Sequence, residues 1–160
     1  MLRLKAIGLA IVVGAMLMAC GSEDGGDNGG GDVCLNEATG DRSTYPAAPY
    51  GTTECSVIDN HSFTNADGST LSLGDIYADP EAKVLLLTTS AGWCPACIEE
   101  QPTLEAWHNT YGSQGLRVVG TLFADENDSP VGADYAANWT NNYNLTFPVV
   151  ADTEQVLSAY

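Results

Sequence analysis

Hydrophobic residues recur in two alternating patterns along the second half of the sequence. Two short runs are almost wholly apolar or β-branched, Lys83–Thr89 (KVLLLTT) and Leu116–Phe123 (LRVVGTLF), as is typical of strands buried on both faces. Between them, Pro95 fits the first position of a helix that continues to about Tyr111. The alternation of strand and helix predicts an α/β fold with parallel strands and right-handed crossovers.

The spacing of apolar residues also predicts which helix faces turn inward. In the first helix, four residues share one stripe: Cys97, Leu104, Trp107 and Tyr111. Ser129 and Pro130 suit the N-cap and first positions of a second helix over Val131–Asn142. Tyr135 and Trp139 follow Val131 at helical spacing, so we expect that face to pack in the core.

The pattern extends the sheet in both directions. Phe147–Ala151 predicts a third strand, and Thr153–Tyr160 has the pattern of the start of another helix. Upstream, Phe63 leads to a hairpin-type turn at Asp67-Gly68, and Thr70–Leu73 follows it. This order predicts a small antiparallel ribbon before the parallel strands.

The first twenty residues carry an export pattern. Met1–Lys5 is short and basic, and Ala6–Met18 is uncharged but too short to span a hydrocarbon core of ~30 Å. The tetrapeptide Leu17-Met18-Ala19-Cys20 resembles a bacterial lipobox, in which the signal is cut before the cysteine and the thiol is lipidated. A plain secretory peptide is the alternative. We expect residues 1–19 to be a lipoprotein signal peptide and Cys20 to carry the lipid.

A glycine- and aspartate-rich tether follows the lipidated cysteine over residues 20–32. Its second residue is Gly21 and not Asp, so the inner-membrane retention signal known in some Gram-negative bacteria is lacking. The expected location is therefore a bacterial membrane, the outer one if the cell is Gram-negative. The domain would then face the periplasm or the exterior.

The charge balance excludes some partners. The sequence has 21 acidic and 5 basic side chains, and removing Arg3 and Lys5 with the signal leaves 3 against 21, a net charge of −18. Such a surface repels phosphate backbones and anionic headgroups, so we expect no nucleic-acid partner.

Five cysteines leave four for disulfide chemistry once Cys20 is lipidated. Four cysteines allow three pairings, and outside the cytoplasm they can oxidise. Pairing Cys34 with Cys55, and Cys94 with Cys97, is the most economical choice. A Cys34–Cys55 bridge would be structural and worth about 3 kcal/mol by loop-closure entropy. A second redox couple or a metal pair is the alternative.

The sequence Trp93-Cys94-Pro95-Ala96-Cys97 places two cysteines at a predicted helix N-terminus. Free backbone N–H groups and the helix dipole there stabilise a thiolate at the first cysteine. That thiolate attacks a disulfide, and the second thiol resolves the mixed disulfide. We therefore predict Cys94 as nucleophile and Cys97 as resolving thiol. A purely structural bridge or half of a zinc site are the alternatives, although His61 and His108 lie far from other ligands in sequence.

Around this motif the sequence resembles the TlpA/ResA-type thiol-disulfide oxidoreductases. The resemblance rests on a strand, then Trp-Cys-Pro-Ala-Cys, then Glu100-x-Pro102, and it continues through Gly115–Gly120 and Tyr143–Val150. These are exported, membrane-tethered members of the thioredoxin-like redoxin superfamily, which includes the alkyl hydroperoxide reductase/thiol-specific antioxidant group. The resemblance implies a thioredoxin-like fold, protein thiols or disulfides as substrates, an upstream electron donor, no cofactor and no metal.

One departure from the family bears on the site. Thioredoxin has a buried Asp six positions before the first cysteine, where this sequence has Thr88, whose hydroxyl cannot take the proton of the deeper thiol. Glu100 is a candidate substitute proton acceptor, or else a solvated acid that complements the helix dipole. Trp93 is expected to flank and shield the cysteine pair, or else to pack in the core.

The resemblance covers residues 55–160, which we expect to form the thioredoxin-like domain after an N-terminal extension over 33–54. In the family a cis-proline loop, a hairpin and a closing helix follow the segment that matches Val156–Tyr160. All three are lacking from this sequence, so we expect a C-terminally truncated version of a longer protein. The strand at Lys83–Thr89 would then have one unpaired edge.

The leading hypothesis is a lipid-anchored oxidoreductase that cycles Cys94 and Cys97 between dithiol and disulfide. A thiol peroxidase is one alternative, although peroxiredoxins place a Pro-x-x-x-Thr-x-x-Cys motif that the residues before Cys94 do not match. A redox-inert or metal-binding lipoprotein is the other alternative.

Overall fold

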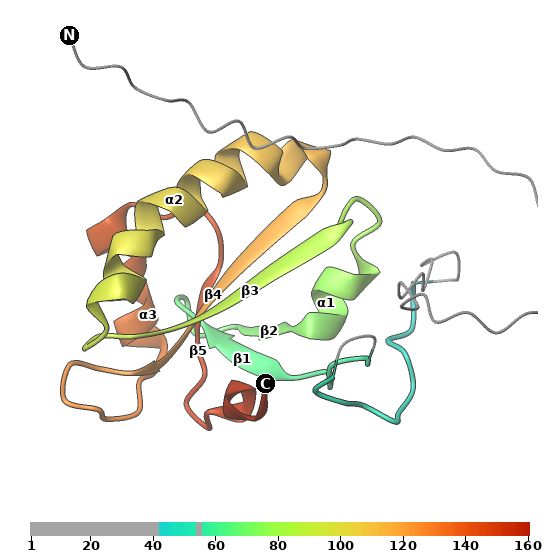
Figure 1. Ribbon diagram of the computed structural model, residues 1–160, viewed down its shortest axis with the longest axis horizontal. Coiled ribbons are helices and arrows are strands. Elements are labelled where there is room, and N and C mark those ends of the chain that lie inside the picture. The colour runs from blue at the N-terminus through green and yellow to red at the C-terminus, as the bar shows by residue number, and fades with distance from the viewer. Residues whose placement is uncertain (1–41, 54–55) are drawn as a thin grey trace, which may run out of the picture. The chain divides into compact units, whose positions relative to one another are not determined.

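The computed structural model describes residues 42–53 and 56–160. Cys20, Cys34 and Cys55 lie outside these residues, and with them the predicted lipidation site and the Cys34–Cys55 bridge. The elements in chain order are β1 (Ser62–Asn65), β2 (Thr70–Ser72), α1 (Leu73–Ala78), β3 (Val84–Ala91), α2 (Pro95–Tyr111), η1 (Gly112–Gln114), β4 (Leu116–Ala124), α3 (Ala133–Tyr143), β5 (Val149–Ala151) and η2 (Val156–Ala159), where η marks a 3₁₀ helix (Figure 1).

One mixed sheet of five strands organises the fold, in the order β2-β1-β5-β4-β3. β3, β4 and β5 are parallel, and β1 pairs antiparallel with both β2 and β5. α2 and α3 cover one face of the sheet, whereas α1 and η2 lie on the other (Figure 1). The predicted α/β fold, the antiparallel ribbon and the parallel strand order are therefore confirmed. Among the described residues, no helix combines the length and apolar character that crossing a membrane requires.

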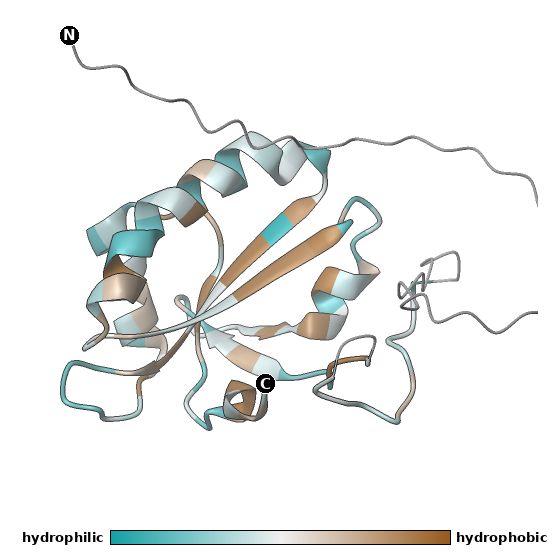
Figure 2. Ribbon diagram, viewed as in Figure 1, coloured by the Kyte–Doolittle hydropathy of each residue, from teal (hydrophilic) through white to brown (hydrophobic). Residues whose placement is uncertain are grey.

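Two cores form on the two faces of the sheet. Leu104 of α2 and Trp139 of α3 pack with Val118 and Leu122 on one face. On the other face, Leu73 of α1 and Leu157 of η2 pack with buried residues of the sheet. Figure 2 shows hydrophobic residues along both β3 and β4, as a sheet covered on two sides requires.

β3 is the last strand of the sheet and pairs only with β4 among the described residues. Its leucines alternate between the two cores: Leu86 packs on the α2 side, and Leu85 and Leu87 pack on the other. They are nevertheless only half-buried, and Val84 is 60% exposed. The prediction that this run is buried on both faces was too strong, because one edge of the strand is open.

Two helix predictions were wrong in detail. α3 begins at Ala133 and not at Val131. The carbonyl of Ser129 accepts the Asp125 N–H (2.9 Å) and is not free to accept a donor from a helical turn. The carbonyl of Val131 likewise accepts the Thr153 hydroxyl (2.7 Å). These bonds close a loop that keeps Ser129 from capping the helix. On α2, Leu104 is buried as predicted, but Trp107 is 43% exposed and Tyr111 is also exposed.

α1 was not predicted, although the sequence contains its start signal. The Ser72 hydroxyl accepts the Asp75 N–H (3.1 Å), and the Asp75 carboxylate accepts the Ser72 N–H (2.8 Å). This reciprocal pair is a capping box, which satisfies two donors that the first helical turn leaves free. Assigning Thr70–Leu73 to a strand hid this signal, because the strand ends at Ser72 and Leu73 already belongs to the helix.

Glu105 on α2 holds the segment before β5. Its carboxylate accepts the Thr146 N–H (2.8 Å), the Thr146 hydroxyl (2.7 Å) and the Asn109 amide (2.8 Å). Burial opposes ionisation of Glu105, but the bonds from Thr146 and Asn109 outweigh it, so the pKa of the carboxyl is lowered in the fold. The ionised form therefore ties α2 to the chain that enters β5.

We expect Glu105→Gln to lower the free energy of unfolding by about 1 kcal/mol at pH 7. Because the folded pKa lies below the unfolded one, this contribution is present above the unfolded pKa and is lost as the pH falls through the folded value. Denaturant unfolding at pH 7 and near pH 3.5 measures the difference. Glu99→Gln, an exposed acid on the same helix, is the matched control. An equal deficit at both pH values would contradict the prediction.

Candidate functional site

The two predicted cysteines meet at the carboxyl end of β3, where α2 begins. Cys94 and Cys97 form a disulfide with their Cα atoms 5.3 Å apart. Cys94 is the N-cap of α2, and Pro95 occupies the first turn, as the sequence predicted. The Cys94 N–H donates to the carbonyl of Ala91 (3.1 Å), a fully buried residue at the end of β3. The sheet thereby fixes where the helix and its sulfurs start.

The Cys94 sulfur receives a backbone donor from the first turn of α2. The Cys97 N–H lies 3.2 Å from Cys94 Sγ. Both cysteines are partly exposed, so a client can reach the bridge. In the reduced state a negative charge on Cys94 would gain from this N–H and from the positive end of the helix dipole. The arrangement can therefore support attack by one thiolate and resolution by a neighbouring thiol.

Trp93 lies directly beside the disulfide and is 50% exposed. Its indole N–H donates to the Asp128 carboxylate (3.0 Å), and its ring meets Phe123 edge-on, with ring centres 6.0 Å apart. Trp93 is therefore not a core residue, and its role of flanking and shielding the cysteine pair stays a prediction. Sequence reasoning missed Asp128, because nothing in its local sequence points to a residue 35 positions away.

The loop between β4 and α3 holds Asp128 in place. The Asp125 carboxylate accepts the N–H groups of Asn127 (2.8 Å) and Ser129 (2.9 Å). Asp128 itself has a φ of 62°, a left-handed conformation that Asp tolerates better than most residues. Local hydrogen bonds thus shape the loop that presents the acceptor to Trp93.

Gly92 lets the same loop approach the cysteine segment closely. A Cβ at Gly92 would lie 2.8 Å from the Glu126 nitrogen and 2.9 Å from the Asp125 carbonyl carbon, and would overlap the Tyr135 hydroxyl. That hydroxyl donates to Glu126 Oε1 (2.9 Å). Burial, followed by this hydrogen bond and the nearby carboxylates, raises the pKa of Tyr135. Tyr135 packs against the core as predicted, and its hydroxyl also reaches the active-site loop.

Glu100, the predicted proton acceptor, and Thr88, which stands where thioredoxin has a buried Asp, differ in their surroundings. Glu100 is exposed on α2 and has no hydrogen-bond partner within the described part of the chain. Thr88 Oγ1 is buried and makes no hydrogen bond there. The role assigned to Glu100 therefore stays a prediction. Cys94, Cys97 and Trp93 are brought together at one end of the sheet.

The histidines take no part in this site. His108 stacks near Phe147, with ring centres 5.9 Å apart, and His61 lies near Tyr160 at 5.7 Å. Each has one buried ring nitrogen without a hydrogen bond in the described structure. Within residues 42–53 and 56–160, no three His, Cys, Asp or Glu side chains gather as metal ligands would.

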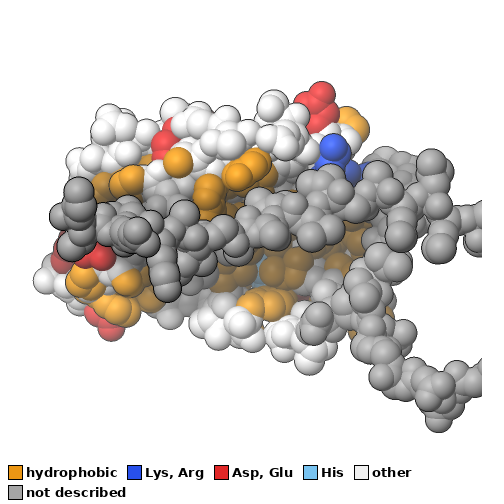
Figure 3. Space-filling view, turned by 45° about the horizontal axis from the view of Figure 1, so that its top comes forward, with side chains coloured by type: hydrophobic (Ala, Val, Ile, Leu, Met, Phe, Trp, Pro, Cys, Tyr) orange, Lys and Arg blue, Asp and Glu red, His pale blue; other side chains and the backbone are white. Residues whose placement is uncertain are grey.

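Positive charge is confined to the opposite end of the described domain. Its basic side chains are Arg42, Lys83 and Arg117, near the amino ends of β3 and β4. Arg117 pairs with Asp79 at 2.7 Å, and Arg42 donates to the Ala82 carbonyl at 2.8 Å. In Figure 3 the visible basic side chains lie toward the right-hand end, and carboxylates also occur at the left-hand end. Among the described residues, the cysteine end therefore carries no basic side chain.

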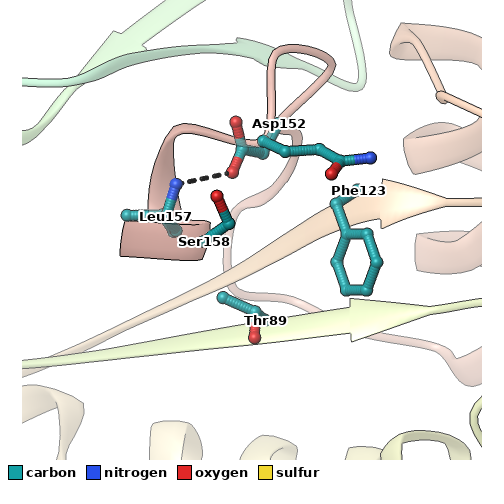
Figure 4. Close-up of a pocket in the computed structure, with 6 residues that line it drawn as sticks. Thr89, Phe123, Asp152, Leu157 and Ser158 are labelled. Atoms are coloured by element: carbon teal, nitrogen blue, oxygen red, sulfur yellow. Dashed lines mark hydrogen bonds between the residues drawn. The ribbon is translucent and has the colours of Figure 1, made fainter. Parts of the chain in front are cut away.

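A cavity of about 160 Å³ lies on the face of the sheet that α1 and η2 cover, between Thr89, Phe123 and the turn after β5 (Figure 4). Asp152 borders it and is only 4% exposed. Its carboxylate accepts the N–H groups of Val156 (2.9 Å) and Leu157 (3.1 Å), so it caps η2. These bonds account structurally for the buried acid.

Comparisons with known proteins agree with this geometry. The model of the AhpC/TSA family matches residues 56–160. The chain is 30% identical to the thiol-disulfide oxidoreductase ResA of Bacillus thuringiensis (strain Al Hakam) over 96 residues, which are 60% of this chain and 50% of that protein. It is 29% identical to the thioredoxin-like protein YneN of Bacillus subtilis (strain 168) over 119 residues, 73% of this chain and 64% of that one.

Among solved structures, a hypothetical protein, SMc02350, from Sinorhizobium meliloti 1021 superposes with a TM-score of 0.54 at 19% identity. The match covers 71% of this chain and 58% of that one. This likeness concerns the fold, and together the matches confirm the thioredoxin-like α/β fold and the resemblance read from the cysteine motif. The chain spans about half the length of the ResA protein it matches.

Proposed function

The chain belongs to the AhpC/TSA family, and on this premise we propose that it is a thiol-disulfide oxidoreductase acting through Cys94 and Cys97. One observation carries the proposal: the two sulfurs are bonded to each other at a helix N-cap that is open to solvent. A bridge between residues so close in sequence staples very little chain, so it has small structural value. Its position suits redox exchange instead.

In the reductive direction, the Cys94 thiolate attacks one sulfur of a client disulfide. A bond forms between Cys94 Sγ and that sulfur, the client bond breaks, and the released client thiolate takes a proton from solvent. Cys97 then loses its proton and attacks Cys94 Sγ, which releases the second client thiol. Two electrons have passed to the client, and the Cys94–Cys97 bond has re-formed. A separate dithiol donor must reduce it before the next cycle.

Proton removal from Cys97 is the step for which Glu100 is proposed. It lies one helical turn after Cys97 on α2, where a carboxylate can accept a proton directly or through water. Trp93 directly precedes Cys94, and Asp128 holds its indole N–H. We propose that its ring limits water at the mixed disulfide.

Reduction of insulin disulfides by the purified protein, with dithiothreitol as electron donor, tests the proposed activity. We expect insulin reduction to be accelerated, and hydrogen peroxide not to be consumed at a comparable rate. Rapid peroxide consumption that needs Cys94 but not Cys97 would favour a thiol peroxidase. Failure to accelerate either reaction, while the Cys94–Cys97 bond still opens and closes, would refute both activities.

We also propose that the protein is anchored to a bacterial membrane through lipidated Cys20. The lipobox-like sequence ending at Cys20 and the glycine-rich stretch after it support this proposal. Metabolic labelling of expressing bacteria with an alkyne fatty acid should mark the wild-type protein and not the Cys20→Ser variant. Labelling that is equal in both would refute the anchor and leave the thiol chemistry unaffected.

A further inference from the structure

A pocket of about 270 Å³ opens between the cysteine segment and α3. We call it the α2–α3 pocket, and its lining includes Gly92, Ile98, Asn138, Trp139, Asn142 and Tyr143. Gly92 lies two residues before Cys94, and Ile98 directly follows Cys97. The pocket therefore reaches residues that flank the two cysteines in sequence, and it extends along one face of α3. It lies on the α2 face of the sheet, away from the cavity of Figure 4.

Two free amides mark one side of the pocket. Asn138 and Asn142 are exposed, one helical turn apart on α3, and their side chains make no hydrogen bonds among the described residues. Each amide offers two donors and an acceptor. A peptide group needs the same complement, one acceptor for its N–H and one donor for its carbonyl. These side chains can thus bind backbone without reading sequence.

The spacing of the two amides suits an extended chain. Residues four apart on a helix are separated by about 6 Å along its axis. Peptide groups that face the same side of an extended segment repeat every two residues, or about 6.7 Å. Asn138 and Asn142 can therefore meet successive peptide groups of one extended segment.

Aromatic side chains form the floor beside these amides. Trp139 and Tyr143 meet edge-on with ring centres 4.8 Å apart, and Tyr135 lies 6.4 Å from Trp139. Trp139 is buried, and Tyr143 is half-buried. The only charged side chain in the lining is Glu126, which accepts the Tyr135 hydroxyl. A lining whose one charged side chain is an acid favours neutral or basic segments over acidic ones.

We propose that the α2–α3 pocket binds an extended segment of the client next to the cysteine that bonds Cys94. This inference rests on the proposed oxidoreductase function and adds a substrate subsite to it. Once a client cysteine is bonded to Cys94, the client residues next to that cysteine are held near the pocket. They can therefore enter it without a separate binding step. The amides hold the client backbone, and the aromatic floor takes its side chains.

The test compares a peptide disulfide with small disulfides. The peptide substrate is a neutral ten-residue peptide whose central cysteine forms a mixed disulfide with cysteamine. The small disulfides are 5,5′-dithiobis(2-nitrobenzoate) and cystamine. The reduced wild-type protein reacts with each of them in turn. We expect the double variant Asn138→Ala/Asn142→Ala to slow the peptide reaction on the order of 10-fold, since two hydrogen bonds are lost. The small disulfides should react at the wild-type rate.

Asn141→Ala is the matched control, because Asn141 is exposed on the same helix and does not line the pocket. It should react like the wild type. A peptide N-methylated beside its cysteine should react with the wild type more slowly than the parent peptide does. Equal slowing of peptide and small disulfides, no slowing of the peptide, or slowing by Asn141→Ala would each overturn the subsite. A wild-type protein that reacts with no disulfide would instead overturn the proposed function.

Discussion

Cys94→Ser is expected to lower turnover of a protein disulfide on the order of 10³-fold, whereas Cys97→Ser should stop the reaction halfway. The asymmetry follows from the two roles. A serine hydroxyl at the N-cap does not ionise near neutral pH and cannot start the exchange. With serine at position 97, the Cys94 thiolate still attacks, but nothing displaces it from the client. Cys97→Ser should therefore accumulate a mixed disulfide that non-reducing gel electrophoresis and intact-mass spectrometry detect.

The helix N-terminus distinguishes the two sulfurs by geometry alone. Cys94 is the N-cap and receives the Cys97 N–H, whereas Cys97 lies within the first turn. If Cys97→Ser failed to trap a client and Cys94→Ser trapped one instead, the assignment of nucleophile and resolving thiol would be reversed. A Cys94→Ser variant with full activity would refute the dithiol mechanism altogether.

Gly92→Ala is expected to cost about 2 kcal/mol of stability, the second largest effect, because three groups occupy the space of the new methyl. Two of them are backbone atoms of Asp125 and Glu126, which cannot rotate away as a side chain can. The loop that carries Asp128 must therefore move, and Trp93 loses its hydrogen-bond acceptor. Thermal or denaturant unfolding measures the cost.

Gly112→Ala provides a matched control for this substitution. Gly112 follows α2 with a helical φ of −55°, and nothing lies within 4 Å of a Cβ placed there. An alanine should be neutral or slightly stabilising at that position. If Gly92→Ala and Gly112→Ala unfolded at the same denaturant concentration as the wild type, the close approach of the loop to the cysteine segment would be wrong.

The sequence predicted those parts of the fold that depend on local pattern. α2 has the predicted bounds, because Pro95 and helical spacing act within the segment itself. The strand at Leu116 and the ribbon around Asp67-Gly68 were likewise predictable from short runs and a turn. The start of α3 was not, because carbonyls at Ser129 and Val131 are used by residues outside the helix.

In the candidate site, too, the features that depend on local sequence were predictable and those that depend on distant residues were not. The cysteine pair and its helix follow from five consecutive residues, beginning at Trp93. The contacts that position this segment join residues far apart in sequence, such as Trp93 with Asp128 and Gly92 with Tyr135. No periodicity encodes these contacts, since they depend on how a loop folds over a neighbouring strand. The amides of Asn138 and Asn142 become meaningful only once α3 is placed beside the cysteines.

The hydrogen bond from Tyr135 to Glu126 affects how rates should be read across the alkaline range. Because burial raises its pKa further above the usual value near 10, this phenol keeps its proton while an ordinary or activated cysteine deprotonates. The bond anchoring α3 to the cysteine loop therefore does not change between pH 6 and pH 9. A bend in a plot of reaction rate against pH over that interval therefore does not report the loss of this bond.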